Sequence, residues 1–195
     1  MKSVATALLL IDVQQGFYNQ DYWGGNRNNP GAEANIEKLL LHWRAQALPV
    51  LHVKHDSVNP ASPLHPSHAG NAFMDVAVPK QGEPLFPKQV NSAFIGTGLK
   101  EYLDELGITK LLIVGLTSNH CVSTTARMAG NFGYDVYVAE DATATFDRIS
   151  FDGKLFKAQD IHEISLANLH GEFATIVKTE EMILHHTNTF SHAGA

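Results

Sequence analysis

The fold is decided by the stretch Ala7-Leu8-Leu9-Leu10-Ile11-Asp12-Val13-Gln14. Its five apolar residues in a row leave no polar face, which is typical of a parallel β-strand covered by helices on both sides. A carboxylate follows this run directly. The segment therefore predicts a buried strand that ends at a polar group, Asp12.

The rest of the chain alternates between strand and helix signals. Further buried strands are expected at residues 49–53, 111–114, 136–139 and 174–177. Periodic apolar residues or capping residues predict helices at 32–46, 99–106, 120–131, 160–172 and from Thr179 onward. Alternation of this kind predicts an α/β fold, in which a parallel sheet carries helices on both faces.

Length and composition limit the classes of function. The chain has 195 residues, of which 44% are hydrophobic and 17% charged, so we expect one globular domain over 1–195, with a flexible tail at 185–195. The net charge of -6 and the lack of a basic patch argue against a nucleic-acid partner. No apolar run is long enough to span a membrane, and the single cysteine favours a reducing, cytoplasmic location.

Three polar residues are expected at the carboxyl ends of the strands, where parallel sheets bind their ligands. Asp12 ends the first strand, Cys121 follows strand 111–114, and Lys88 lies in a long segment, 55–94, that holds six of the eight prolines. Such long loops are usually functional.

Each residue also has a simpler interpretation. A thiol in the first turn of a helix is favoured as thiolate, but a free cysteine is often buried and inert. A carboxylate just past a strand often caps the next helix or pairs with an arginine, although the helix after Asp12 begins well downstream. Most lysines are solvated surface charges. Only the combination of the three residues is specific.

This combination resembles the isochorismatase-like cysteine hydrolases. The matching blocks run in the expected order over about residues 5–183: Asp12-x-Gln14; Lys88 ahead of Ser92-Ala93-Phe94; Gly115-Leu116-Thr117-Ser118-Asn119-His120-Cys121-Val122-Ser123-Thr124-Thr125; Gly133-Tyr134-Asp135-Val136; Glu140-Asp141-Ala142; and His162-Glu163-Ile164-Ser165-Leu166-Ala167.

The resemblance implies a three-layer α/β/α, Rossmann-like fold with a mostly parallel six-stranded sheet. It also implies a catalytic triad of Asp12, Lys88 and Cys121, and a non-proline cis peptide at Leu116–Thr117. The backbone N–H groups of Thr117 and Cys121 would form an oxyanion hole. Lys88 would hold Cys121 near thiolate for attack on a small-molecule amide, and Asp12 would move the protons and activate water to hydrolyse the thioester.

The pocket is expected to be mostly apolar. The candidate substrate-binding residues are Gln14, Phe17, Tyr22, Trp23, His55, Phe94, Asn119 and His120, with Thr117 beside them. Phe17 and Trp23 would serve equally well in a core or an interface. Because neither Arg27 nor Arg44 is placed to bind a carboxylate, a small neutral or aromatic amide is favoured over a dicarboxylate.

One departure from the family concerns metal binding. Nicotinamidases of the family carry an Asp-x-His metal motif after the second strand, where this chain reads His55-Asp56-Ser57. We therefore expect catalysis without a metal or other cofactor. The alternative is a different site built from His55, His65 and His68, whose spacing is generic.

Other functions remain open at this stage. They are an isochorismatase-type hydrolysis of a vinyl ether, a thiol redox role, and a catalytically idle scaffold. The redox role would leave Lys88 and Asp12 without a purpose, and the intact triad argues against the scaffold. The family also commonly oligomerises, so we expect a homo-oligomer. The proline-rich loop would supply apolar side chains to the contact between subunits, namely Leu64, Phe73 and Met74.

Overall fold

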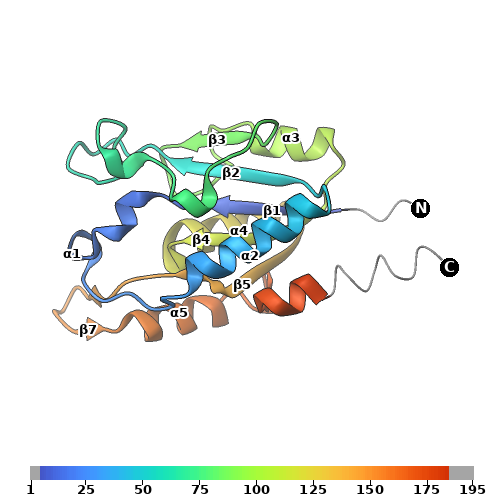
Figure 1. Ribbon diagram of the computed structural model, residues 1–195. Helices are drawn as coiled ribbons and strands as arrows, with labels where there is room; N and C mark the ends of the chain where they lie inside the picture. Colours follow the sequence, from blue (N-terminus) through green and yellow to red (C-terminus); the bar gives the residue numbers. More distant parts are fainter. Residues whose placement is uncertain (1–4, 185–195) are drawn as a thin grey trace.

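A computed structural model describes residues 5–184 and contains one central sheet (Figure 1). The strand order is β3 (Leu85–Lys88), β2 (Val50–His55), β1 (Thr6–Ile11), β4 (Lys110–Leu116), β5 (Asp135–Ala144) and β8 (Thr175–Val177). All five neighbouring pairs are parallel. The predicted α/β fold with a six-stranded parallel sheet is therefore confirmed.

Helices cover both faces of this sheet. The first face carries α2 (Ala32–Ala45) and the helical residues 179–184. The opposite face carries α3 (Leu99–Glu105), α4 (Ser123–Asn131) and α5 (Ala158–Ala167). The two apolar clusters divide accordingly, so the molecule has the three layers that the resemblance implied.

Strand β1 lies inside the sheet, between β2 and β4, and is buried along its whole length. Leu8 and Leu10 pack into the α2 side, whereas Leu9 and Ile11 pack into the α3–α4 side. The continuous apolar run is thus explained, because each side chain meets a helical layer whichever way it points.

Short elements connect the strands at the carboxyl edge of the sheet. After β1 come two short helices, η1 (Gln15–Tyr18) and α1 (Gln20–Trp23). A π-helix, η4 (Ser118–Val122), joins β4 to α4. The remaining short elements are η2 (Ala69–Asn71), η3 (Asp75–Ala77), and the antiparallel pair β6 (Arg148–Ile149) and β7 (Leu155–Phe156).

The structure differs from the sequence-based prediction mainly at β3, because the sequence predicts a loop over residues 55–94. Pro87 hid this strand, because proline cannot donate a ladder hydrogen bond and is confined to sheet edges. Here β3 is the edge strand and pairs only with β2. Strand β5 also runs further than residues 136–139, and α5 ends earlier than the predicted 172.

Two other expectations concern the surroundings of the molecule. Leu64 and Met74 are buried within this chain, so the loop does not offer them for contact with a second copy. The homo-oligomer stays a prediction, and the expected tail at 185–195 lies outside the described residues. Within residues 5–184, none of the helices has the length and apolar character needed to cross a bilayer.

Gly115 lies near the carboxyl end of β4, beside the site, at a position that has no room for a side chain. It has a φ of 115°, and a Cβ added there would overlap the backbone of Ile11 in β1. Gly133 also has a positive φ, 87°, but a Cβ there would meet open space. Gly115→Ala should therefore lower the free energy of unfolding by about 3 kcal/mol or more, and Gly133→Ala by about 1 kcal/mol. Urea unfolding measures both, and equal losses would contradict this account of Gly115.

Candidate active site

The three predicted catalytic residues meet at the carboxyl edge of the sheet. Asp12 directly follows β1, Lys88 is the last residue of β3, and Cys121 lies in η4 after β4. The arrowheads of β1, β2 and β3 point to this same side of the molecule (Figure 1). Because parallel strands end together, residues far apart in the chain share one site.

The ammonium of Lys88 is at the centre of this cluster. Its Nζ lies 2.6 Å from Asp12 Oδ2, 2.9 Å from His55 Nδ1 and 3.3 Å from Cys121 Sγ. An ammonium has three protons and no acceptor, so these three contacts use all of its donors. His55 Nδ1 must accept, which places the proton of the neutral imidazole on Nε2.

The charge state of Lys88 follows from its partners. Burial alone would lower the pKa of the ammonium, but the carboxylate of Asp12 and the sulfur of Cys121 outweigh it and raise the pKa above its usual value. The pKa of His55 is lowered by burial and by the charge of Lys88. The cluster at neutral pH is therefore an ion pair of Lys88 and Asp12 with a neutral imidazole beside it.

Cys121 rests as a thiol, contrary to the expectation of a resting thiolate. Burial raises the pKa of the thiol, and the nearby Asp12 carboxylate raises it further, while Lys88 opposes both. The ammonium is already neutralised by Asp12, so it has little net charge to offer the sulfur. Deprotonation of Cys121 thus requires a base that takes the proton as the sulfur reacts.

Asp12 has a free oxygen for this purpose. Its Oδ2 accepts from Lys88, whereas Oδ1 is buried and has no hydrogen-bond partner among residues 5–184. Atoms of Asp12, His55 and Cys121 lie within 4.8 Å of one another. Asn91 also faces the sulfur, with Oδ1 at 3.7 Å from Cys121 Sγ. A carboxylate oxygen without a donor, close to a thiol, is a suitable proton acceptor.

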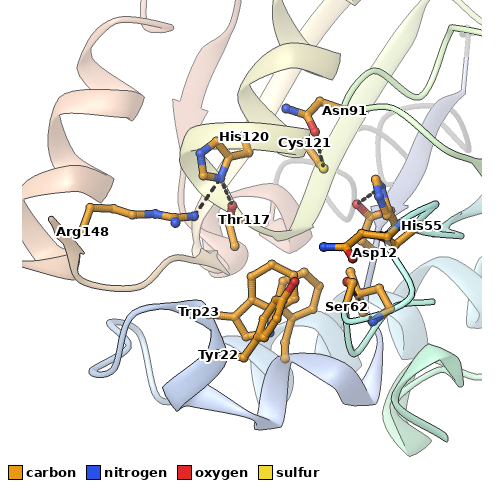
Figure 2. A pocket seen from close by; sticks show the side chains of 14 residues that line it. Asp12, Tyr22, Trp23, His55, Ser62, Asn91, Thr117, His120, Cys121 and Arg148 are labelled. Carbon is orange, nitrogen blue, oxygen red and sulfur yellow. Dashed lines mark hydrogen bonds and ion pairs between the residues drawn. The ribbon is translucent and has the colours of Figure 1, made fainter. Parts of the chain in front are cut away.

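The cluster opens into a cavity of about 330 Å³ (Figure 2). Its lining residues are Asp12, Phe17, Tyr22, Trp23, His55, Ser57, Asn59, Ser62, Leu64, Asn91, Thr117, His120, Cys121 and Arg148. One wall is aromatic: the ring of Trp23 lies 4.7 Å from that of Phe17 and 4.9 Å from that of Tyr22. The volume and this wall suit a small, planar molecule.

Six of the predicted pocket residues line this cavity: Phe17, Tyr22, Trp23, His55, Thr117 and His120. The peptide bond between Leu116 and Thr117 is cis, as the resemblance implied. The oxyanion hole at the backbone of Thr117 and Cys121 stays a prediction.

Three other predicted pocket residues lie outside the lining. Gln14 is buried, donates to the carbonyls of His55 and Asn71, and accepts from the N–H of His55, so its amide is fully used within the protein. Phe94 packs against the aromatic residues Phe132 and Tyr134. The Oδ1 of Asn119 accepts from the hydroxyl of Thr145. These residues position the elements around the site and do not face the cavity.

Sequence reasoning missed several polar groups of the pocket. Asn91 stands three residues after Lys88, in a segment that the motif already marked. Ser57, Asn59 and Ser62 come from the long loop, where no periodicity selects individual residues. Arg148 is the most consequential, because the sequence analysis found no cation placed to bind a carboxylate. Its one signal was its position just after a strand, β5.

The residues of the cluster do not suit a metal ion. Asp12, His55 and Cys121 are the one group of three such ligands within residues 5–184. The Lys88 ammonium, however, lies within 3.3 Å of an atom of each and supplies a positive charge among them. A metal at this position would have to displace that ammonium. His65 is half-buried and contacts the hydroxyl of Ser67, whereas His68 is exposed and bonds to the carbonyl of Pro60, so neither belongs to this cluster.

Comparisons with known proteins agree on one family. The family model described as the isochorismatase domain matches residues 6–181. The isochorismatase family protein YrdC of Bacillus subtilis is 45% identical over 91% of this chain and 94% of its own. Nicotinamidase 3 of Arabidopsis thaliana is 28% identical, over 92% and 88% of the two chains. A crystal structure of an isochorismatase family hydrolase from Chromobacterium violaceum has a TM-score of 0.91 and 41% identity, and the match covers 96% of each chain.

The opposite effects of Asp12 and Lys88 on the Cys121 thiol predict alkylation rates with iodoacetamide. Asp12→Asn removes the negative charge that raises the thiol pKa, so alkylation at neutral pH should be about tenfold faster for each unit of pKa lost. Lys88→Met should make it slower. The exposed carboxylate of Asp75 provides the control, because Asp75→Asn should leave the rate unchanged. Slower alkylation in both site variants would contradict these electrostatics and indicate a general disturbance.

Proposed function

This chain belongs to the isochorismatase family, and from that premise we propose that it is a cysteine-dependent hydrolase that cleaves the amide bond of a small molecule through a thioester. The observation that supports this most strongly is the closeness of the Cys121 thiol to the Asp12 carboxylate, within 4.8 Å, together with the free Oδ1 of that carboxylate, which has no hydrogen-bond partner among residues 5–184. Both residues contact the same ammonium and line the same cavity. A nucleophile and its base are thus held beside a place for substrate.

In the first half-reaction the thiol would add to the amide carbonyl. The sulfur forms a bond to the carbon while its proton moves to Asp12 Oδ1, so no free thiolate has to accumulate. The carbonyl oxygen becomes an oxyanion, which the backbone N–H groups of Thr117 and Cys121 would stabilise. Asp12 then passes the proton to the leaving nitrogen, the C–N bond breaks, and ammonia or an amine departs.

In the second half-reaction water would release the acid. Asp12, again a carboxylate, removes a proton from a water molecule that adds to the thioester carbon. The C–S bond breaks and the proton returns to the sulfur. The balance is one amide and one water consumed, with one carboxylic acid and one ammonia or amine formed. Cys121 and Asp12 end in the states in which they began.

Lys88 and His55 would act by position and charge. The Lys88 contact occupies Oδ2 of Asp12 and leaves Oδ1 available. His55 accepts from Lys88 through Nδ1, so the proton of its neutral imidazole is on Nε2, and the residue lines the cavity. Neither residue needs to gain or lose a proton during the cycle.

The relationship to Nicotinamidase 3 supports amide chemistry, because that relative is an amidase by name. The alternative within the family is hydrolysis of a vinyl ether, which needs no acyl-enzyme. Hydroxylamine separates the two reactions, because it converts a thioester into a hydroxamate. Hydroxamate formed from a substrate amide supports the proposal, whereas turnover of a vinyl ether, with no hydroxamate from any amide, favours the ether reaction.

Loss of the nucleophile should abolish turnover. In an ammonia-release assay over a panel of small amides, Cys121→Ser should lower kcat/KM by about a thousandfold or more. Asp12→Asn should lower it by about a hundredfold or more. Combining the two should add little, because the residues act as one unit. Thr124→Ala, in the helix α4 that directly follows η4 but outside the cavity lining, should retain activity. Activity of Cys121→Ser near that of the wild type would refute the nucleophile.

Turnover should also survive removal of metals. The Lys88 ammonium supplies the positive charge of the site, and the thiol needs no metal-bound water for the first step. We therefore expect the same kcat/KM before and after exhaustive chelation, with metal content followed by mass spectrometry. Activity that disappears and returns with zinc, iron or manganese would show that a metal displaces Lys88 and would overturn the triad proposed here.

A further inference from the structure

Among residues 5–184, Arg148 is the one cation that lines the cavity, and no carboxylate of this part of the chain pairs with it. Arg27 and Arg44 pair with Glu33 and Glu83, whereas residues 5–184 provide no ion pair for Arg148. Its Nη2 donates to His120 Nδ1 at 3.2 Å, and its Nε is shielded from solvent without a hydrogen-bond partner in the described part of the chain. A half-buried guanidinium with unused donors is costly unless an anion joins it.

The surroundings do not remove this positive charge. The adjacent carboxylate, Asp147, accepts from Asn26, Lys157 and the N–H of Ala158 instead. Burial lowers the pKa of His120, and the charge of Arg148 lowers it further, so the imidazole remains neutral and acts as an acceptor. The acid of the cavity, Asp12, is paired with Lys88.

Arg148 also lies at the far end of the cavity from the reacting groups. Figure 2 shows it extending toward His120 and Thr117 from the side opposite Asp12 and His55, with Tyr22 and Trp23 between the two ends. A molecule that reaches Cys121 with one end can therefore direct its other end to the guanidinium. The aromatic wall would contact the part in between.

We propose that Arg148 binds a carboxylate of the substrate, so that the amide cleaved at Cys121 belongs to a small monoanion with a short, planar body. This inference rests on the proposed function for the reacting end and adds the recognition of the other end. The planar fork of a guanidinium matches a carboxylate. It replaces the expectation of a neutral amide, which assumed that the pocket holds no such cation.

Two compounds of nearly the same shape provide the test. Para-carbamoylbenzoate carries an amide and a carboxylate, and para-nitrobenzamide replaces the carboxylate by an uncharged nitro group. Succinamate and its methyl ester repeat the comparison without a ring. Affinity is measured by calorimetry on the Cys121→Ala protein, and ammonia release is measured on the protein with Cys121 intact.

We expect the anion of each pair to bind about ten- to a hundredfold more tightly than its neutral partner. Arg148→Met should abolish this preference and leave the affinity for the neutral compound nearly unchanged. Arg148→Lys should retain a reduced preference, because an ammonium keeps the charge and loses the fork. Lys154→Met is the matched control, since it removes a cation from the same hairpin outside the cavity lining.

The two proposals fail in different ways. If the anions bind more tightly and Arg148→Met abolishes the preference, the carboxylate site is supported, whether or not ammonia is released. Absence of ammonia release would then contradict only the proposed amide hydrolysis. If ammonia is released but each pair binds equally, Arg148 has no such role. Equal binding, no detectable binding of any of the four compounds, or an equal loss in Lys154→Met would overturn the proposal. Thermal unfolding of each variant checks that the fold is retained.

Discussion

The candidate site depends on how the buried ammonium of Lys88 is satisfied. A buried, unpaired ammonium is strongly destabilising, so its three protons must each find an acceptor. They find Asp12, His55 and Cys121, at 2.6, 2.9 and 3.3 Å. One group thereby fixes the distances between a carboxylate, an imidazole and a thiol. The same arrangement leaves one oxygen of Asp12 without a donor, and that oxygen is the one the proposed chemistry uses.

The sheet topology supplies these acceptors from separate parts of the chain. Asp12 lies 76 residues from Lys88, and Cys121 lies 33 residues from it. Strand register explains the contact with His55, because His55 and Lys88 are paired as the last residues of β2 and β3. Gln14 then ties this edge together, since its amide bonds to the backbone of His55 on both sides. A motif residue expected at the substrate is thus part of the frame that positions the imidazole.

The parts that could be predicted from sequence are those governed by local rules. The run from Ala7 to Ile11 required a strand with two covered faces, and it is buried throughout. Strand β3 was missed because Pro87 breaks the local pattern, and only the edge position in the assembled sheet permits it. The thiolate expected at Cys121 failed for a similar reason. Its pKa depends on Asp12 and on burial, which the order of residues in the chain does not show.

The residues at the two ends of the cavity also differ in how well the sequence predicts them. At the reacting end, the three protons of the Lys88 ammonium are matched by acceptors within the protein. The catalytic residues there belong to recognisable sequence blocks at the ends of strands. At the other end, Arg148 begins the short strand β6 after β5, and the Nε of its guanidinium has no hydrogen-bond partner within residues 5–184. The contacts around Lys88 hold the reacting groups in one arrangement, whereas the guanidinium of Arg148 keeps a donor that a bound ligand would satisfy. In this protein the choice of substrate is therefore expected to rest on residues that the motifs do not include.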